Sequence, residues 1–254
     1  MIARPARLIA AAGRPYAAAS RTLPMAPRLL IFAKRPAPGR TKTRLCPPLS
    51  AEAAAALYEC FLRDTLDIAR AAPAAERIVA FLPEDAAGYF AGLAPDMALA
   101  PQRGTDLGER MDRLLAEALR DGGPAVAIGS DSPTLPPAHI AAAFAHLNAG
   151  ADVALGPSDD GGYYLIGLRR PQPRLLREVP MSTPDVLRAT LALAGALGLR
   201  VALLPAWYDV DTAAELERLR AELMVSPGTA QHTRAFLEEL DTHGARNGGR
   251  RPPR

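Results

Sequence analysis

Five cationic side chains lie close together in the segment FAKRPAPGRTKTRL (residues 32–45), directly after an apolar run. They are Lys34, Arg35, Arg40, Lys42 and Arg44. Because like charges at this density repel one another, the segment favours an anionic partner, and phosphate oxygens suit both guanidinium and ammonium groups. Both lysines of the whole chain fall here, against 28 arginines. We expect a phosphate-binding turn around Gly39; a solvated basic loop is the alternative.

The segment AVAIGSDSPTLP (residues 125–136) brings Asp131 to the end of a second apolar run. Pro133 and Pro136 then turn the chain into the next helix. A carboxylate at a strand end, beside a phosphate-binding loop, is where a hard divalent cation such as Mg²⁺ or Mn²⁺ would bridge the protein and a diphosphate. The alternative is that Asp131 only closes a turn.

Two more aspartates, Asp209 and Asp211, stand two positions apart in WYDVDTAAEL (residues 207–216). On an extended segment they point to the same side, so one or both could complete a metal site with Asp131. Residues Thr212 to Glu215 have the spacing of a helix capping box. We therefore expect Asp209 to be a metal ligand, and Asp211 to be a ligand or part of the cap.

The segment LGPSDDGGYYLIGL (residues 155–168) combines acids, glycines and tyrosines. Gly161 and Gly162 would let the backbone approach a ligand, and Asp160 could accept a proton or a hydrogen bond. Tyr163 and Tyr164 begin a strand, so one ring faces each side of the sheet. A tight Asp-Gly hairpin turn explains the same residues without any chemistry.

Weaker signals come from RGTDLGERM (residues 103–111) and from the histidines. Asp106 and Glu109 have capping-box spacing, which helix initiation alone explains, although the neighbouring glycines leave room for a base or a sugar. The four histidines are scattered along the chain and form no pattern typical of a catalytic triad or a metal site. Cys46 and Cys60 are the only cysteines, which excludes a disulfide framework and favours a reducing cytoplasm.

Short apolar runs alternate with amphipathic stretches between residues 28 and 223. The expected strands are 29–33, 77–82, 125–129, 152–155, 163–168 and 201–204, and the expected helices are 51–71, 107–120, 137–148, 184–197 and 213–223. This alternation predicts an α/β fold: three α/β/α layers, Rossmann-like, with a mostly parallel mixed sheet. Ligands bind such sheets at the carboxyl ends of the strands, where the motifs lie.

The ends of the chain differ from its middle in composition. Residues 1–25 hold four arginines and no acid, and residues 226–254 hold five arginines and three acids, so residues 26–225 carry a net charge of −3. The basic excess thus lies in the tails, which argues against a nucleic-acid partner. No stretch approaches the roughly 18 apolar residues of a membrane span.

We expect one catalytic domain over residues 26–225. Residues 1–25 would be an extension outside it, with Met25 as a possible true start. The tail, 226–254, would hold a short helix near 234–240 and an unstructured end from residue 243.

The four motifs in this order resemble the nucleotide-diphospho-sugar transferase (GT-A-like) superfamily, over about residues 28–223. The closer resemblance is to a bacterial glycosyltransferase-like family once catalogued as a domain of unknown function, some members of which are named for arsenosugar biosynthesis or association with radical-SAM proteins. The sequence also looks related to 2-phospholactate and molybdenum cofactor guanylyltransferases.

The resemblance implies roles for particular residues. Lys34, Lys42 and Arg44 would hold phosphates, Asp131 would be the metal and ribose aspartate, and Asp209 and Asp211 would form the second acidic motif. Asp160, Gly161, Gly162 and Tyr163 match the family's D-G-G-Y segment. Met181 departs from the aromatic residue expected before Ser-Thr.

Together these features predict a metal-dependent transferase that binds a nucleotide or nucleotide-sugar and a small-molecule acceptor. Glycosyl transfer from a nucleoside diphosphate-sugar is the first hypothesis, and nucleotidyl transfer with release of pyrophosphate is the second. The cationic segment would stabilise negative charge on the leaving group in either case. A nucleotide-binding module without turnover is the third hypothesis.

Overall fold

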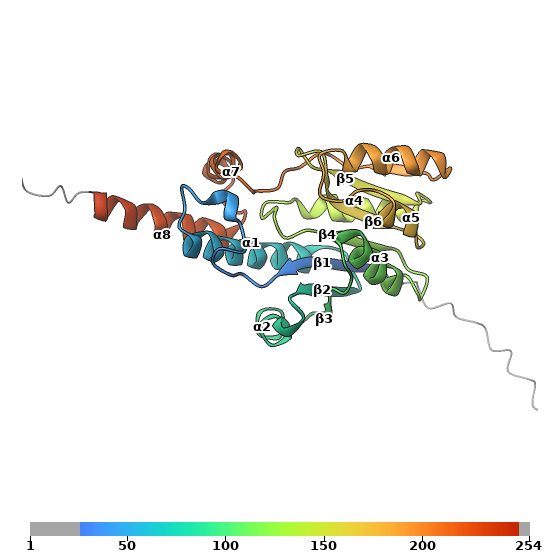
Figure 1. The fold of residues 1–254 in the computed structure, drawn as a ribbon, viewed down its shortest axis with the longest axis horizontal. Coiled ribbons are helices and arrows are strands. Elements are labelled where there is room, and N and C mark those ends of the chain that lie inside the picture. Colours follow the sequence, from blue (N-terminus) through green and yellow to red (C-terminus); the bar gives the residue numbers. More distant parts are fainter. Residues whose placement is uncertain (1–25, 249–254) are drawn as a thin grey trace, which may run out of the picture.

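The computed structural model describes residues 26–248 and the side chains of residues 26–242. A seven-stranded sheet in the order β3-β2-β1-β4-β6-β5-β7 forms its centre (Figure 1). Strand β6 is antiparallel to its neighbours β4 and β5, and the remaining pairs are parallel. The strands are β1 (Arg28–Lys34), β2 (Glu76–Leu82), β3 (Ala98–Pro101), β4 (Ala125–Ile128), β5 (Val153–Pro157), β6 (Tyr163–Leu168) and β7 (Val201–Leu203).

Helices cover both faces of the sheet. They are α1 (Ala51–Ala71), α2 (Ala87–Leu93), α3 (Leu107–Ala118), α4 (Pro137–Asn148), α5 (Pro173–Arg177), α6 (Val186–Ala196), α7 (Ala213–Val225) and α8 (Gln231–Gly248), with short 3-10 turns η1 (Thr43–Leu45) and η2 (Glu84–Ala86). One face of the sheet packs against α1, α2 and α4, and the other against α3, α5 and α6. This arrangement confirms the predicted three-layer architecture.

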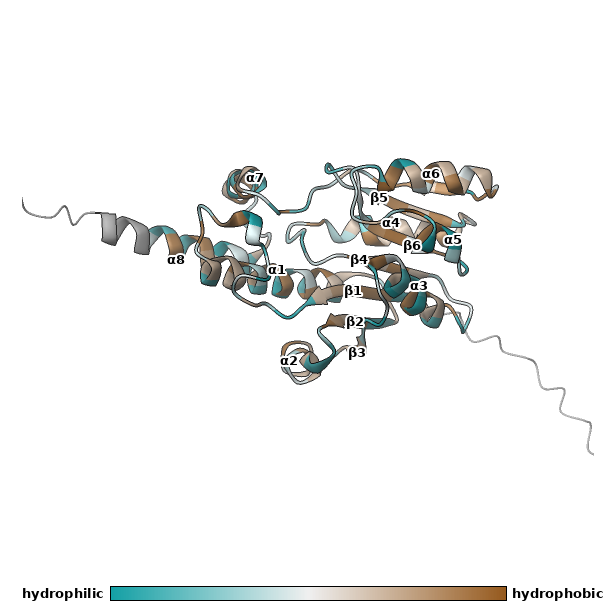
Figure 2. Ribbon diagram, in the orientation of Figure 1, coloured by the Kyte–Doolittle hydropathy of each residue, from teal (hydrophilic) through white to brown (hydrophobic). Residues whose placement is uncertain are grey.

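The period of two along a strand explains the two core layers. In β1, Leu29 and Ile31 belong to one core cluster, and Leu30 between them belongs to the other. All three are fully buried, because successive side chains point to opposite faces and helices cover both. Figure 2 shows β1 and β2 hydrophobic along much of their length, whereas hydrophilic residues lie on the helices, notably α3 and α5, and in the loops.

A third core cluster lies outside the sheet and joins α1 to the last two helices. Leu57 and Phe61 of α1 are buried there with Leu219 of α7 and Leu237 of α8. Helix α8 runs alongside α1 (Figure 1). The first part of α8 is therefore packed on the body of the fold.

The structure corrects some of the predicted elements. Strand β3 and helices α2 and α5 were not predicted, because each is at most seven residues long and therefore too short to show a period. Helix α8 continues to Gly248, although an unstructured end was expected from residue 243. The expected extension, residues 1–25, lies outside the described residues, as do residues 249–254. Among the described helices, none has both the length and the apolar character that crossing a membrane requires.

Candidate functional site

The sequence motifs meet at one edge of the sheet. Lys34 ends β1, Asp131 follows β4 by three positions, and Asp160 follows β5 by three. These strands share one direction, so their carboxyl ends lie at the same edge. Strand β6 runs the opposite way and therefore begins there, with Tyr163.

A pocket of about 830 Å³ opens at this edge and brings together residues from all four motifs. The predicted site residues that line it are Lys34, Lys42, Arg44, Asp131, Asp160, Gly162, Tyr163, Asp209 and Asp211. Cationic and anionic side chains, distant in sequence, thus face one space.

Lys42 is the most deeply placed cation of the pocket. Its Nζ lies 2.5 Å from Oδ1 of Asp131 and 2.7 Å from Oδ1 of Asp211, and its side chain is 4% exposed. The rings of Tyr58 and Phe61 flank the ammonium, with centroids 5.9 and 5.6 Å from Nζ. Lys42 therefore contacts carboxylates in this structure, whereas the sequence predicted a phosphate ligand.

The surroundings of Lys42 hold it in the charged form. Burial alone would lower the pKa of Lys42, but the charges of Asp131 and Asp211, with the hydrogen bonds to both, raise it well above its usual range. Its backbone is left-handed, at φ 50° and ψ 37°. Such a conformation costs a residue with a side chain about 1–3 kcal/mol and is found where surrounding structure imposes it.

Asp209 accepts hydrogen bonds from two serines. Ser132 donates a hydrogen bond to its Oδ1 at 2.5 Å, and Ser158 donates to its Oδ2 at 3.3 Å. Burial raises the pKa of Asp209 to about 6, and the charge of Asp131 adds to the effect. Both oxygens of this predicted metal ligand are thus occupied by hydroxyl groups.

Tyr58 connects the loop after β1 to the end of β4. Its hydroxyl accepts a hydrogen bond from the backbone N–H of Lys34 at 3.1 Å and lies 2.8 Å from the hydroxyl of Ser130. Ser130 in turn donates to the carbonyl of Phe32 at 3.1 Å. Burial raises the pKa of Tyr58 to about 12. This chain of hydrogen bonds fixes the spacing between Lys34 and the residue before Asp131.

The predicted Asp-Gly turn joins β5 to β6 as a hairpin, and it also shapes the pocket. The backbone N–H of Gly162 donates to Oδ1 of Asp160 at 2.9 Å, which fixes that carboxylate at the pocket wall. Gly161 has φ +88°, and a Cβ at this position would lie 1.9 Å from the carbonyl oxygen of Pro184. Only glycine allows the turn to pack so closely on the segment before α6.

Part of the pocket lining is apolar. Tyr163 and Met181 face the pocket there, and the Tyr163 hydroxyl donates to Sδ of Met181 at 3.6 Å. Tyr164 belongs to the core cluster on the other side of the sheet, as its strand position predicted. Helix α3 also lines the pocket and is held against α5, since a Cβ on Gly108 would lie 2.0 Å from the carbonyl oxygen of Leu176.

Arg110 of α3 is a pocket residue that the sequence interpretation missed. Its Nε is buried without a hydrogen-bond partner among the described residues. It shares a helix face with Leu107 and Met111, which also line the pocket, because residues three and four apart lie together. An arginine inside the apolar stripe of an amphipathic helix was the available signal.

Three predicted binding residues, Gly39, Asp106 and Gly161, do not line the pocket. Gly39 has φ +71° in the cationic turn, and Gly161 packs as described above. Asp106 caps α3, and its Oδ1 accepts the backbone N–H of Glu109 at 2.8 Å. Asp106 and Glu109 thus form the helix start that their spacing indicated. Thr212 likewise caps α7, together with Glu215, and the carboxylate of Asp211 contacts Lys42 instead.

The predicted cation site fits two of its three aspartates. Carboxylate oxygens are the donors that Mg²⁺ and Mn²⁺ prefer, and Asp131 and Asp211 together hold one ammonium. Among residues 26–242, the carboxylate oxygens of Asp131, Asp209 and Asp211 do not all lie within 4.8 Å of one another. Asp131 and Asp211 thus share one cationic group, Asp209 is held by two serines, and the role of all three as metal ligands stays a prediction.

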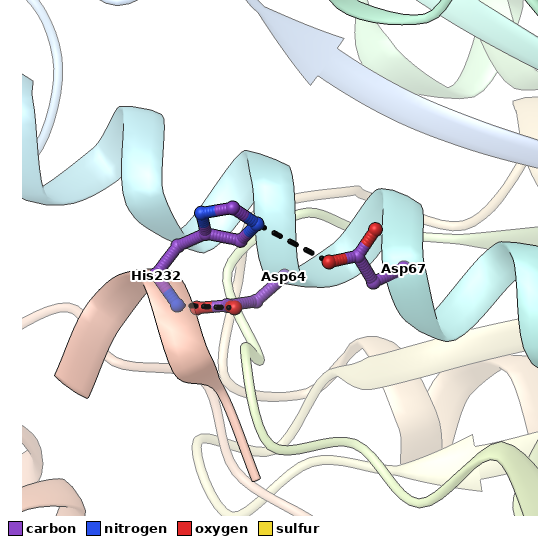
Figure 3. Close-up of side chains that lie close together, drawn as sticks. All are labelled: Asp64, Asp67 and His232. Atoms are coloured by element: carbon purple, nitrogen blue, oxygen red, sulfur yellow. Dashed lines mark hydrogen bonds and ion pairs between the residues drawn. The ribbon is translucent and has the colours of Figure 1, made fainter. Parts of the chain in front are cut away.

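A different set of residues does meet that distance limit: Asp64 and Asp67 of α1 with His232 of α8 (Figure 3). Asp64 accepts hydrogen bonds from the backbone N–H groups of His232 and Thr233 and from the Thr233 hydroxyl. Nε2 of His232 lies 3.2 Å from Asp67. Because Asp64 caps the start of α8, these contacts attach one helix to the other, and none of the three residues lines the pocket.

Comparison with solved structures defines the class of fold. The chain is 35% identical, with a TM-score of 0.79, to a protein of Desulfovibrio desulfuricans G20 provisionally assigned as a nucleotide-diphospho-sugar transferase; the match covers 85% of this chain and 95% of that one. The architecture is therefore that of the nucleotide-diphospho-sugar transferase fold. A family model described as "Uncharacterized protein conserved in bacteria (DUF2064)" matches residues 65–183, and the chain belongs to this family.

More distant structures share the fold. A cytidylyltransferase from Leptospira borgpetersenii serovar Hardjo-bovis (strain JB197) is 13% identical with a TM-score of 0.53, over 91% of this chain and 100% of that one. CMP:2-keto-3-deoxy-manno-octonic acid synthetase, solved with CTP, is 15% identical with a TM-score of 0.50, over 79% and 99% of the two chains. No curated protein matches the chain.

Proposed function

We propose that the protein is a metal-dependent transferase that moves a sugar from a nucleoside diphosphate-sugar to a small acceptor. The observation that carries the proposal is the pocket itself, in which cations without partners face a carboxylate pair. The relative from Desulfovibrio desulfuricans, provisionally assigned as a nucleotide-diphospho-sugar transferase, supports the choice of donor.

The charges suit a diphosphate. Four of the cations that line the pocket, Lys34, Arg40, Arg44 and Arg110, make no side-chain ion pair or hydrogen bond with the described residues. Unpaired cations facing one another favour an anion between them. We place the donor phosphates against these side chains, with Asp131 and Asp211 holding Mg²⁺ or Mn²⁺, which would neutralise charge on the diphosphate.

The acceptor would approach from the side of Asp160. A smaller hollow of about 160 Å³ adjoins the pocket and shares Arg44, Asp160, Asp209 and Asp211 with it. In the transfer step, an acceptor hydroxyl attacks the anomeric carbon, and the bond from that carbon to the phosphate oxygen breaks. Asp160 accepts the hydroxyl proton, and the cations stabilise the negative charge left on the nucleoside diphosphate.

Nucleotidyl transfer is the second candidate, and the excess of unpaired cations favours it. Here an acceptor oxygen attacks the α-phosphorus of a nucleoside triphosphate, and the bond to the bridging oxygen breaks with release of pyrophosphate. Pyrophosphate carries more charge than the β-phosphate of a departing nucleoside diphosphate, so it needs more neutralisation. A cytoplasmic enzyme fits the two free cysteines in either case.

Product analysis distinguishes the candidates. The protein is incubated with Mg²⁺ or Mn²⁺, nucleoside triphosphates or nucleotide-sugars, and a panel of small acceptors, while nucleoside diphosphate and pyrophosphate are assayed in parallel. Nucleoside diphosphate release from a nucleotide-sugar supports sugar transfer, and pyrophosphate release supports nucleotidyl transfer. Asp131→Asn should abolish either product. Tight nucleotide binding without either product would contradict both and indicate a binding module.

A further inference from the structure

Lys42 contacts both Asp131 and Asp211, the two aspartates that would hold a divalent cation. Its Nζ contacts one oxygen of each carboxylate, at 2.5 and 2.7 Å. The lysine side chain is 4% exposed, whereas the carboxylate side chains are 42% and 43% exposed. The ammonium thus fills the inner end of the gap between the two aspartates, and the acids remain open to the pocket.

We propose that Lys42 makes cation binding conditional on the nucleotide. In the free protein its ammonium satisfies Asp131 and Asp211, so a divalent ion competes poorly for them. When phosphates enter the pocket they offer Lys42 an alternative anionic partner, and the divalent ion then joins the carboxylates. The nucleotide half of this inference rests on the proposed function.

The charge balance gives the reason. Two carboxylates and one ammonium sum to −1, and a divalent ion added beside the buried ammonium would change this to +1. Such cations repel strongly in a partly desolvated site unless an anion comes between them. A diphosphate supplies that anion, so metal and nucleotide must each raise the affinity of the other by the same factor.

The position of Lys42 in the chain allows the exchange of partners. It lies in the loop between β1 and η1 and not within a regular element. Arg40 and Arg44, two positions away on either side, also line the pocket. Phosphates bound by these arginines would therefore lie near the ammonium, so that only the side chain of Lys42 needs to turn.

Titration with Mn²⁺ tests the inference without any turnover, because the electron paramagnetic resonance signal reports free Mn²⁺. We expect the wild type alone to bind Mn²⁺ weakly. With saturating CTP, GTP or UDP-glucose, each tested separately, it should bind at least tenfold more tightly, after allowance for the affinity of Mn²⁺ for each free nucleotide. Lys42→Gln without nucleotide should bind Mn²⁺ at least tenfold more tightly than the wild type.

Two controls locate the effect. Arg44→Gln also removes a pocket cation, but one without contact to the carboxylates, and should change Mn²⁺ affinity less than threefold. Adding Asp131→Asn to Lys42→Gln should abolish the gain. Circular dichroism checks the folding of each variant. If Lys42→Gln does not fold, the wild-type titrations with and without nucleotide decide whether the inference holds.

The inference is overturned if folded Lys42→Gln binds Mn²⁺ no more tightly than the wild type, or if the wild type binds Mn²⁺ equally well with and without a nucleotide that it binds. A gain in Lys42→Gln, with no nucleotide bound by the wild type, would support the competition between lysine and metal and contradict the proposed function. The two failures are therefore distinguishable.

Discussion

The cations of the pocket differ in their partners, although they look alike in the sequence. Lys42 is paired with two aspartates, whereas Lys34 and Arg44, in the same segment, have no side-chain partner among the described residues. The difference arises because Lys42 turns inward beneath the rings of α1. The sequence could predict that several cationic side chains gather in this segment, but not which of them points into the protein.

Arg110 offers a direct test of the unpaired cations. Arg110→Gln should weaken binding of a nucleoside diphosphate-sugar or triphosphate by about 10- to 150-fold, since a charge-assisted hydrogen bond contributes about 1.5–3 kcal/mol. Isothermal titration calorimetry measures the loss. Arg113→Gln is the matched control, because Arg113 lies on the same helix but pairs with Glu109 outside the pocket. Equal losses in the two variants would contradict a role for Arg110.

Cys60 should react slowly with alkylating reagents. Burial, with the charges of Asp64 and Glu59, raises the pKa of its thiol from 9.0 to about 11. A raised pKa means less thiolate at any lower pH, so at pH 8 the thiolate fraction falls about 100-fold below that of an unperturbed thiol. In a Cys46→Ser background, the rate of iodoacetamide labelling should rise about tenfold per pH unit up to about pH 11. A plateau near pH 9 would contradict this.

At the scale of elements, glycine contacts hold the loops of the pocket. Gly161→Ala should destabilise the protein by about 2–4 kcal/mol, because the new Cβ would meet the Pro184 carbonyl oxygen and φ is positive. Gly195→Ala, in α6 with open space around its Cβ, should instead stabilise by about 0.5–1 kcal/mol. Urea unfolding measures both, and the prediction fails if the two substitutions have the same sign.

The attachment of α8 to α1 depends on one carboxylate. Asp64→Ala should lower the free energy of unfolding by about 2–4 kcal/mol, since it leaves three donors at the start of α8 without their acceptor. Asp67→Ala removes the exposed contact with His232 and the exposed ion pair with Arg70, and should cost at most about 1 kcal/mol. Hydrogen exchange in α8 should increase in the first variant alone; equal exchange in both would contradict the cap.

At the scale of the whole molecule, the pocket walls come from segments spread over much of the chain, so a bound ligand should stabilise the entire fold. A nucleotide with Mg²⁺ at 100 times its dissociation constant should add about 2.7 kcal/mol, which raises Tm by about 5–10 °C. Differential scanning calorimetry measures the shift. Mg²⁺ alone should raise Tm by less than about 1 °C. The absence of a shift with every nucleotide would contradict the proposed site.

Much of the architecture could be predicted from the sequence, because the long elements have clear periods. Helix α1 matches its expected range of 51–71, and β6 matches 163–168. The short edge strand β3 could not be predicted, since its four residues show no alternation. The meeting of the four motifs at one edge followed from the parallel strands, which all end there.

The details of the site were less predictable, because they depend on side-chain packing between distant segments. That Asp209 is held by Ser132 and Ser158, while Asp211 meets Lys42, follows from the path of the chain after β7. The two-residue spacing of Asp209 and Asp211 predicted only that their side chains point to the same side of an extended segment. Arg110 was not predicted as a pocket residue, because helix capping alone accounts for the residue pattern of its segment.

The close packing of α3 on α5 restricts how substitutions could change the set of ligands that the pocket accepts. Gly108 brings the helix that carries Arg110 so near to the Leu176 carbonyl that no side chain fits between them. The position of α3 is therefore dictated by a main-chain contact, which substitutions alter with difficulty. Larger or smaller molecules would have to be accommodated by exchanging side chains that line the pocket, such as Met181, whose unbranched thioether adapts its shape.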